Sequence, residues 1–222
     1  MDGAHDMGGM HGFGPVVTPG SELPYHEDWE RRVFALHLVS GLEGLGAGPG
    51  GRQVREEMDP ASYLAASYFE RWTFSAEQRL LRNGTIDPGE VEAMMARLAA
   101  GEDAVELADA AMAERVVARF HRRAPMAPPP ADARFAPGDR VRVQRMRPPG
   151  HTRCPRYVRG IAGTVGRVRG ADRLPDRTTY GLPAEPEPVY AVAFTSQDVW
   201  GRTEEPPFTV LLDLWDSYLA PA

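Results

Sequence analysis

The only cysteine of the chain lies in a basic stretch, PPGHTRCPRYVRG, residues 148–160. Cys154 follows His151 by three residues, so a thiolate activated by a histidine base is the sharpest chemistry that the stretch suggests. Such a nucleophile also needs a third group that holds the base, and no acidic residue stands nearby in the sequence. A neighbouring arginine, here Arg153, lowers the pKa of a thiol. A loop cysteine without catalytic function is nevertheless the favoured interpretation.

Other residue types that hold metals or cofactors are scattered along the chain. The six histidines have no spacing typical of metal ligands, and one cysteine excludes both an internal disulfide and a Cys-x-x-Cys metal site. The Gly-x-Gly elements near the N-terminus follow no predicted strand, so they do not indicate a dinucleotide site. Acidic pairs such as Glu56-Glu57 are most simply solvent-facing. The residues alone do not form a complete active site.

Arginines gather near an aromatic residue in the second half of the chain, in VRVQRMR, RCPRYVR and GRVRG. Small barrels that bind phosphate backbones have this composition. The formal net charge of −6, the pI near 5.6 and the interleaved Asp139 and Asp172 argue against bulk binding to nucleic acid or anionic lipid. All 25 basic residues are arginines, which are planar donors able to hold two oxygens. The residues therefore indicate a protein that binds something through arginines.

An arm rich in glycine and proline opens the chain at residues 1–25. Such a sequence sustains neither a helix nor a regular strand. It carries apolar residues that a disordered tail usually lacks, including Met7 and Phe13, so we expect an extended arm packed against another surface. The arm lacks the pattern of a signal peptide, and no apolar run approaches the roughly 20 residues of a membrane span. A cytoplasmic location is expected.

Helical periodicity and helix start signals follow the arm, and aspartate–proline pairs open two of the expected helices. The expected helices run from Glu27 to the glycine-rich loop 41–51, from Asp59-Pro60 to Asn83-Gly84, from Asp87-Pro88 to Gly101, and over residues 103–121.

A proline-rich linker, residues 124–133, separates the arm and helical domain, 1–123, from a second domain, 134–222. Short segments that alternate or are β-branched predict strands in this second domain, namely FAPGDRVRV, GIAGTVGRV, VYAVAF and FTVLLDLW. Their length favours a small antiparallel barrel, and the first two resemble SH3-like folds. The predicted fold class is α+β: a helical N-terminal half with an extended arm, followed by a small SH3-like antiparallel β-barrel.

Several blocks of the sequence, in order, resemble the β subunit of nitrile hydratase, and the match covers nearly the whole chain. The blocks are MDGAHDMGGMHGFGPV at the start, DWE at 28–30, EEMDPASYLAASYFERW at 56–72, PPGHTRCPRYVRGIAGTVG at 148–166, YAVAFTSQDVWG at 190–201 and VLLDLWDSYLAPA at 210–222. Each block is moderately specific, and their common order makes the resemblance strong.

The resemblance implies a hydro-lyase of nitrile metabolism that adds water to a small nitrile to give the amide. It implies activity only in a complex with an α subunit, as an αβ heterodimer or an α2β2 heterotetramer, with no nucleic acid and no membrane as partner. Co(III) or Fe(III) is expected in the α subunit, held by three cysteines and two backbone amides. Two of those cysteines are expected to be oxidised, to sulfinate and sulfenate, and this chain to bind no cofactor by itself.

By alignment to the flanking blocks, the two essential arginines of the family fall on Arg52 and Arg153. Oxidised cysteine side chains are anions that are costly to bury without a partner. Arginine stays charged and donates to two oxygens at once, so it holds both the charge and the geometry. It also protects a sulfenate, which stands midway on the oxidation ladder. His151, in the Gly-His-x-Arg motif, is expected to support Arg153 without itself being catalytic.

The resemblance also places Tyr68, Trp72 and Phe34 at the substrate pocket. Trp72 stands where some relatives carry tyrosine, so it is expected to offer apolar surface. GPGGR, residues 48–52, departs from the acidic-apolar stretch that usually precedes the first arginine, and leaves a barer loop.

Two other hypotheses remain at this point. One is a subunit of a thiocyanate hydrolase, although the β-like sequence is split over two chains there and one continuous chain of 222 residues favours nitrile hydratase. The other is a non-catalytic SH3-like protein that binds RNA or a protein partner.

Overall fold

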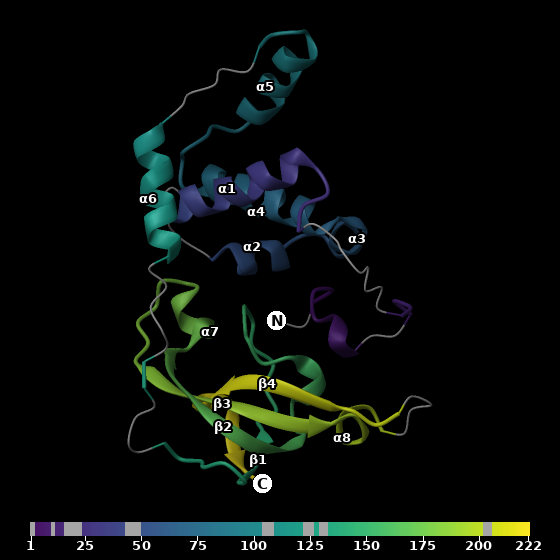
Figure 1. Cartoon of the computed structure of the whole chain (residues 1–222). Coiled ribbons are helices and arrows are strands. Elements are labelled where there is room, and N and C mark those ends of the chain that lie inside the picture. Colours follow the sequence, from purple (N-terminus) through teal and green to yellow (C-terminus); the bar gives the residue numbers. More distant parts are fainter. Residues whose placement is uncertain are drawn as a thin grey trace. The chain divides into compact units, whose positions relative to one another are not determined.

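The computed structural model describes residues 3–9, 12–15, 24–42, 50–103, 109–121, 127–128, 133–201 and 206–222. Two compact units divide the chain: a sheet unit, Met1–Val16 with Pro125–Ala222, and a helical unit, Val17–Ala124. Figure 1 shows helices α1 to α6 in the helical unit and all the labelled strands in the sheet unit. The predicted α+β class and the helical N-terminal half are confirmed.

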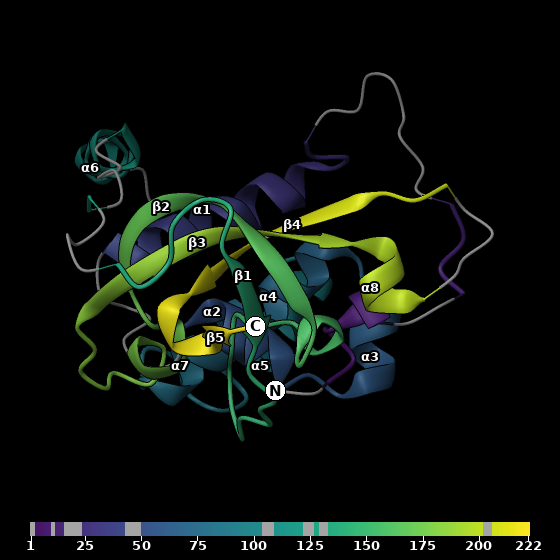
Figure 2. The same ribbon diagram turned by 90° about the horizontal axis from the view of Figure 1, so that it is seen from below.

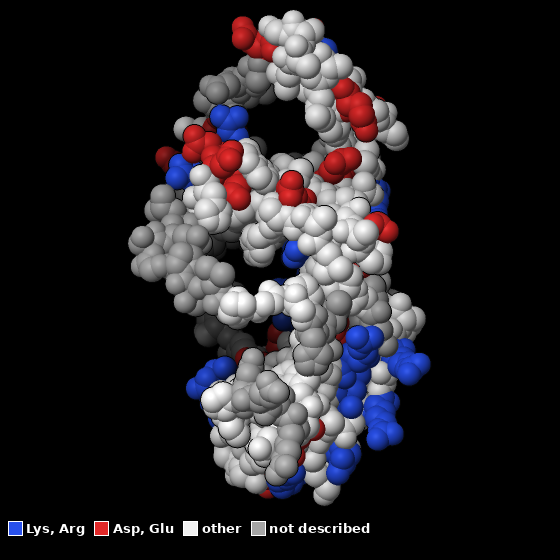
Figure 3. Space-filling model, turned by 90° about the vertical axis from the view of Figure 1, so that its right-hand side faces the viewer, with Lys and Arg blue, Asp and Glu red and all other residues white. Residues whose placement is uncertain are grey.

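The net charge of the chain resides in the helical unit, whose residues 17–124 include 18 acidic residues and 12 arginines. The sheet unit has 13 of each. The face drawn in Figure 3 agrees, since acidic side chains gather over the helices and arginines over the sheet unit.

The helical unit is built around α4. Its helices are α1 Asp28–Leu42, α2 Gly51–Glu56, α3 Pro60–Ala65, α4 Tyr68–Arg82, α5 Glu90–Ala99 and α6 Ala110–His121. Helix α4 packs against α1 and α2, and α6 packs against α1. Val54 of α2 and Phe69 and Ala76 of α4 are buried at these contacts. Among the described residues, no helix combines the length and the hydropathy needed to cross a membrane.

The single helix predicted between Asp59 and Asn83 is wrong, because the structure has two helices there. Ala66 is extended, with φ −69° and ψ 142°, and ends α3. Ser67 then caps α4: its side chain accepts from the backbone N–H of Glu70, and the Glu70 carboxylate accepts from the N–H of Ser67 at 2.6 Å. This reciprocal capping box starts a new helix inside a continuous apolar pattern.

Helix α2 is not predicted by the sequence, since its first residue, Gly51, belongs to the stretch expected to be a loop. Two buried residues, Gln53 and Val54, anchor this short helix. Tertiary packing thus makes this segment helical, although its glycines locally oppose a helix.

The sheet unit contains one antiparallel sheet of five strands in the order β4-β3-β2-β1-β5. The strands are β1 Arg140–Val143, β2 Ala162–Arg173, β3 Pro186–Thr195, β4 Thr209–Trp215 and β5 Leu219–Pro221. Register shifts between β2 and β3, at Val165/Arg167 and Val168/Gly170, increase the local twist. Figure 2 shows the resulting curvature of β2 and β3.

The second domain is an antiparallel sheet, as predicted for the small barrel, but the sheet is not closed. The short turn η3, Asp216–Tyr218, takes the chain from β4 on one edge to β5 on the other, and it contacts β3 on the way. Strand β5 has only three residues, which pair with β1. Strands β4 and β5 lie at opposite edges of the sheet and do not pair with each other, so the sheet stays open.

Buried side chains of the sheet unit form one core. It consists of Phe135, Val141, Val143, Cys154, Val158, Val165, Val189, Tyr190, Val192, Phe194, Leu214, Trp215, Tyr218 and Leu219. Tyr190 and Tyr218 are the largest fully buried side chains, and each donates its hydroxyl hydrogen to a carboxylate, of Asp216 and Asp176 respectively. The core therefore holds two polar groups whose hydrogen bonds are satisfied.

Residues 3–9 of the arm lie against the sheet unit. The Asp6 carboxylate accepts from the backbone N–H of Arg156 at 2.6 Å, and the Gly8 carbonyl accepts from the Trp200 indole at 3.1 Å. A Cβ at Gly8 would lie 2.4 Å from the ring of Tyr157, which itself stacks on Trp200. This part of the arm is thus packed against a surface, and only glycine fits at position 8.

Candidate functional site

Arg52 is exposed on the first turn of α2, and its backbone is tied to α4. Next to it, the carbonyl of Gly51 accepts a hydrogen bond of 2.8 Å from the Ser75 hydroxyl, which is fully buried. A Cβ at Gly51 would lie 3.2 Å from the same oxygen. The close approach favours glycine at this position, whereas Gly48 and Pro49 of the GPGGR stretch lie outside the described residues. The anchored turn fixes where the Arg52 side chain starts.

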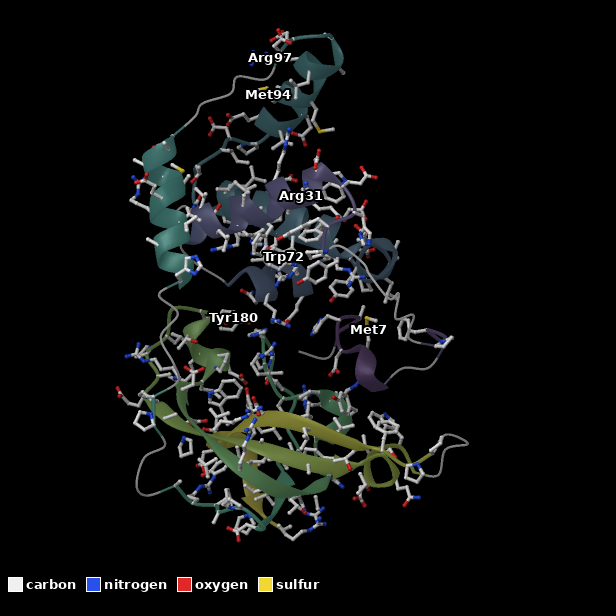
Figure 4. All side chains as sticks on the ribbon, in the orientation of Figure 1. Met7, Arg31, Trp72, Met94, Arg97 and Tyr180 are labelled. Carbon is white, nitrogen blue, oxygen red and sulfur yellow. The ribbon has the colours of Figure 1, made fainter. Side chains whose placement is uncertain are left out.

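The three predicted pocket residues meet within the helical unit. The ring of Trp72 lies 5.6 Å from that of Tyr68 and 6.0 Å from that of Phe34, between ring centroids. Tyr68 is 62% exposed, whereas Phe34 and Trp72 are half-buried. Figure 4 shows Trp72 among the side chains gathered within the helical unit. The cluster is an apolar surface with one accessible phenol at its edge.

His37 and Arg55 also contact Trp72 in this cluster, and the sequence does not predict either contact. The His37 ring meets Trp72 edge-on at 4.6 Å, and its Nε2 lies 2.7 Å from the Trp72 carbonyl oxygen. Since a carbonyl only accepts, Nε2 carries the hydrogen. Burial lowers the pKa of His37, so the ring is neutral at pH 7. The Arg55 guanidinium stacks 4.9 Å from the centroid of Trp72.

Two guanidinium groups therefore leave the same face of α2, since Arg52 and Arg55 are three residues apart. Burial, followed by the neighbouring charge of Arg52, lowers the pKa of Arg55. The Arg55 guanidinium nevertheless stays protonated at neutral pH, because arginine is effectively always charged in proteins. The charge of Arg55 lies over an aromatic face, and that of Arg52 is exposed.

Arg153 is exposed on the loop between β1 and the short turn η2, Arg156–Val158. Its backbone N–H donates to the hydroxyl of Tyr218 at 3.2 Å. The preceding His151 is 3% exposed, and its N–H donates to the hydroxyl of Tyr180 at 2.7 Å. Two tyrosine hydroxyls thus hold the backbone on which Arg153 stands.

Cys154 is 1% exposed and belongs to the core of the sheet unit. Burial raises the pKa of its thiol to about 11, against the smaller opposing effect of Arg159. The thiol is therefore protonated at neutral pH and packs as a small apolar group. The hypothesis of a Cys–His nucleophile, which the sequence already disfavours, is excluded on this ground.

The predicted site residues thus form two groups. Arg52, Phe34, Tyr68 and Trp72 belong to the helical unit, while His151 and Arg153 share one loop of the sheet unit.

A separate hollow of about 620 Å³ lies in the sheet unit, lined by Arg145, Met146, Arg147, Arg156 and Arg159. None of these residues is predicted as a site residue. A sequence signal exists, because the twenty residues from Arg140 to Arg159 contain seven arginines and no acidic residue. Arg159 also donates to the carbonyls of Cys154 and Met146, so it helps to fold the loop that forms the hollow.

The side chains that hold metals in proteins do not converge within the described parts of the chain. No group of three or more histidine, cysteine, aspartate or glutamate side chains able to hold a metal ion occurs among the residues that the structure describes. The chemistry offered by the described residues is hydrogen-bond donation by guanidinium groups beside aromatic surface.

Fold and site together define an α+β chain of two units that displays exposed arginines on anchored backbone. Two family models match it: "Nitrile hydratase beta subunit, N-terminal" over residues 1–121 and "Nitrile hydratase beta subunit, C-terminal" over residues 124–221. The chain belongs to the nitrile hydratase β subunit family.

Relatives of full length agree with this assignment. The chain is 35% identical over 226 residues to a nitrile hydratase subunit β of Pseudomonas putida, covering 100% of both chains. It is 33% identical to a cobalt-containing nitrile hydratase subunit β of Pseudonocardia thermophila, over 99% of this chain and 96% of the relative. A low-molecular weight cobalt-containing nitrile hydratase subunit β of Rhodococcus rhodochrous is 31% identical over 100% of both chains.

A solved structure of thiocyanate hydrolase from Thiobacillus thioparus aligns with 53% of this chain and 100% of its own, at 22% identity and a TM-score of 0.40. A similarity of that size does not distinguish between folds or functions.

Proposed function

We propose that the chain is the β subunit of an enzyme that hydrates nitriles to amides in complex with an α subunit. The observation that carries the proposal is the match of both family models, which together account for residues 1–121 and 124–221. Relatives named as nitrile hydratase β subunits cover the whole chain at 31–35% identity. The chain works as an αβ heterodimer, paired into α2β2, in the cytoplasm.

The metal of the complex, Co(III) or Fe(III), belongs to the α subunit in this proposal. Two of the relatives are named as cobalt-containing. When bound, the metal supplies a Lewis acid for nitrile hydration. The described residues of this chain offer guanidinium groups instead of metal ligands, and these suit the anionic sulfur oxygens around such a metal.

Arg52 and Arg153 are the residues we assign to those oxygens. Both guanidinium groups are exposed on the isolated chain, and both stand on backbone that buried residues anchor. A planar fork donates two parallel hydrogen bonds to an oxidised cysteine, so it neutralises the anion and fixes its orientation. His151 supports Arg153 from the buried side of the same loop.

The aromatic cluster of the helical unit is the part of the pocket that receives the nitrile. Phe34 and Trp72 offer apolar surface, and Tyr68 brings an accessible hydroxyl to its edge. Such a lining excludes water from an apolar substituent and leaves one polar group for orientation. We also assign the open five-stranded sheet to the SH3-like folds, because its long bent β2 pairs with both β1 and β3.

Arg153→Lys tests the assignment directly in the complex with the α subunit. The variant keeps the charge and loses one of the two parallel hydrogen bonds, so we expect kcat to fall about 10- to 100-fold with the metal content unchanged. Arg169→Lys is the matched control, since Arg169 makes an exposed ion pair with Asp213 at 2.9 Å and should tolerate lysine. Turnover of Arg153→Lys within twofold of the parent, at full metal content, would reject the role.

The arginine hollow favours one other function, an RNA-binding protein. Four guanidinium groups surround a space of about 620 Å³ without an acidic residue in the lining. Size-exclusion chromatography with a co-expressed α subunit separates the two hypotheses. A stable complex that hydrates nitriles supports the enzyme subunit, and a monomer that retards RNA at physiological salt supports the alternative.

A further inference from the structure

Two tyrosine hydroxyl groups from distant parts of the sheet unit bind the backbone of the loop that carries Arg153. Tyr218 precedes β5, and Tyr180 follows the short helix α7, Pro175–Thr178. Neither tyrosine adjoins the loop in sequence, since the bonds to His151 and Arg153 span 29 and 65 residues. Figure 4 labels Tyr180 beside α7.

The hydroxyl of Tyr218 is contacted by three polar groups. It lies 3.2 Å from the N–H of Arg153 and 3.3 Å from the hydroxyl of Thr152, and it is hydrogen-bonded to the carboxylate of Asp176. A tyrosine hydroxyl has one hydrogen to donate and two lone pairs that accept. A carboxylate only accepts, so the one hydrogen goes to Asp176 and both lone pairs face the loop. Asp176 therefore orients the Tyr218 hydroxyl, so that its lone pairs face the N–H of Arg153 and the hydroxyl of Thr152.

The same direction continues along the loop. Because Thr152 gives its hydroxyl hydrogen to Tyr218, its oxygen is left to accept, and it does so from the N–H of Cys154 at 3.2 Å. Hydrogen bonds thus run in one sense from the Cys154 amide through Thr152 and Tyr218 to the Asp176 carboxylate. Chains of this kind polarise their members in a buried setting, and Tyr218 is 2% exposed.

Two further contacts hold the loop at its ends. The Arg159 guanidinium donates to the Cys154 carbonyl at 2.9 Å and to the Met146 carbonyl at 3.2 Å. At the other end the Tyr180 hydroxyl accepts from His151, and a Cβ at Gly150 would lie 2.0 Å from that hydroxyl oxygen. The backbone on both sides of Arg153 is therefore fixed, while its side chain remains exposed.

We propose that Tyr218, oriented by Asp176, is a positioning residue for Arg153: it fixes the backbone from which the Arg153 guanidinium reaches the oxidised sulfur ligands of the partner. The catalytic part of this inference rests on the function proposed above. The structural part, that the Asp176–Tyr218 pair holds residues 151–154, does not.

Tyr218→Phe removes the hydroxyl and keeps the ring in the core, and Tyr190→Phe is the matched control. Tyr190 is also fully buried, and it donates its one hydroxyl hydrogen to the carboxylate of Asp216 at 3.0 Å, which lies outside the loop. Hydrogen exchange of the peptide that covers residues 150–155 is measured in the αβ complex. We expect exchange in Tyr218→Phe to be at least about tenfold faster and that in Tyr190→Phe to be unchanged.

Kinetics then test whether the hydrogen-bonded pair of Asp176 and Tyr218, the brace, acts through Arg153. We expect kcat of Tyr218→Phe to fall about tenfold or more with KM within about twofold, since a small displacement of a positioned group is costly. In an Arg153→Lys background the same substitution should have an effect below about twofold, because the group it positions is gone. If Tyr218→Phe lowered kcat by the same factor in the parent and in the Arg153→Lys background, Tyr218 would have a general structural role and the proposal would be overturned.

Asp176→Asn and Asp176→Ala provide a second arm that leaves the core tyrosine intact. Asparagine keeps an acceptor oxygen for Tyr218 and should retain most of the protection and activity, whereas alanine should reproduce Tyr218→Phe. Unchanged exchange in both Tyr218→Phe and Asp176→Ala refutes the brace, whatever the activity. Faster exchange in a complex that does not hydrate nitriles refutes the function proposed for the chain and leaves the brace in place.

Discussion

The thiol of Cys154 gives the most quantitative prediction, because its burial links stability to pH. Its pKa rises from the ordinary value of 9.0 to about 11 in the folded chain. Below the lower value the thiol is protonated in both states and pH has no effect through this group. Between the two values the unfolded chain loses the proton and the folded chain keeps it, so the free energy of unfolding falls as pH rises.

The size of the effect follows from the shift. Two pKa units correspond to about 2.7 kcal/mol, as an order of magnitude, and the loss levels off once pH exceeds the folded value of about 11. Urea unfolding from about pH 8 to about pH 11 measures it, with Cys154→Ala as the reference. The variant starts less stable because a buried group is truncated. The two free energies should then converge as pH rises.

Parallel curves for the parent and Cys154→Ala over this range would refute the burial argument. So would alkylation of Cys154 by iodoacetamide in the folded chain, at neutral pH, at the rate of an exposed thiol. Either result would return the thiol beside Arg153 to the list of reactive groups.

Two further predictions concern local anchors. Ser67→Ala removes the side-chain cap of α4 and should lower the free energy of unfolding by about 1 kcal/mol, which Ser67→Asp should largely restore; thermal unfolding followed by circular dichroism checks both. Gly8→Ala places a Cβ 2.4 Å from the Tyr157 ring and should release the arm, seen as faster proteolysis near the N-terminus and altered fluorescence of Trp200. Gly41→Ala, which meets nothing within 4 Å, should cause neither change.

A helix start is predictable from this sequence where a capping residue is the dominant local pattern. It is not predictable where the capping residue lies inside a longer apolar repeat. Asp59 accepts from the N–H groups of Ala61 and Ser62 at 3.1 and 3.0 Å, as the Asp-Pro pair predicts. The break before α4 had its own signal, the Ser-x-x-Glu pattern of Ser67 and Glu70. It lies inside a continuous apolar repeat, and the repeat dominates any estimate from periodicity alone.

Strand positions follow from alternation, but the closure of the sheet does not. The burial of Val141 and Val143 between exposed arginines is the period of two that the sequence shows. Whether β4 and β5 meet depends on where η3 delivers the chain, and β5 is too short to have a recognisable pattern. Sheet closure is therefore a property of tertiary packing.

The site divides in the same way. The aromatic contacts of Trp72 with Tyr68 are a helical i, i+4 pair, and they follow from one helix. The partners that hold the Arg153 loop lie 29 and 65 residues away, and a tyrosine at such a distance has no local signal. The resemblance to a family identifies Arg153, whereas the tyrosines that hold its loop are identified only from the fold.

Arg52 and Arg153 stand on unrelated elements, yet each is an exposed side chain with buried residues close to it in sequence. Gln53 and Val54 are buried beside Arg52, and His151 and Cys154 are buried around Arg153. Folding of each unit has then already fixed the backbone, so binding an anion need only order the arginine rotamers, at a cost of about 2 kcal/mol each. A bidentate guanidinium–anion contact exceeds that cost only when the fork is well aimed. In the function proposed for Arg52 and Arg153, the buried neighbours therefore determine how well each guanidinium is aimed at an anion.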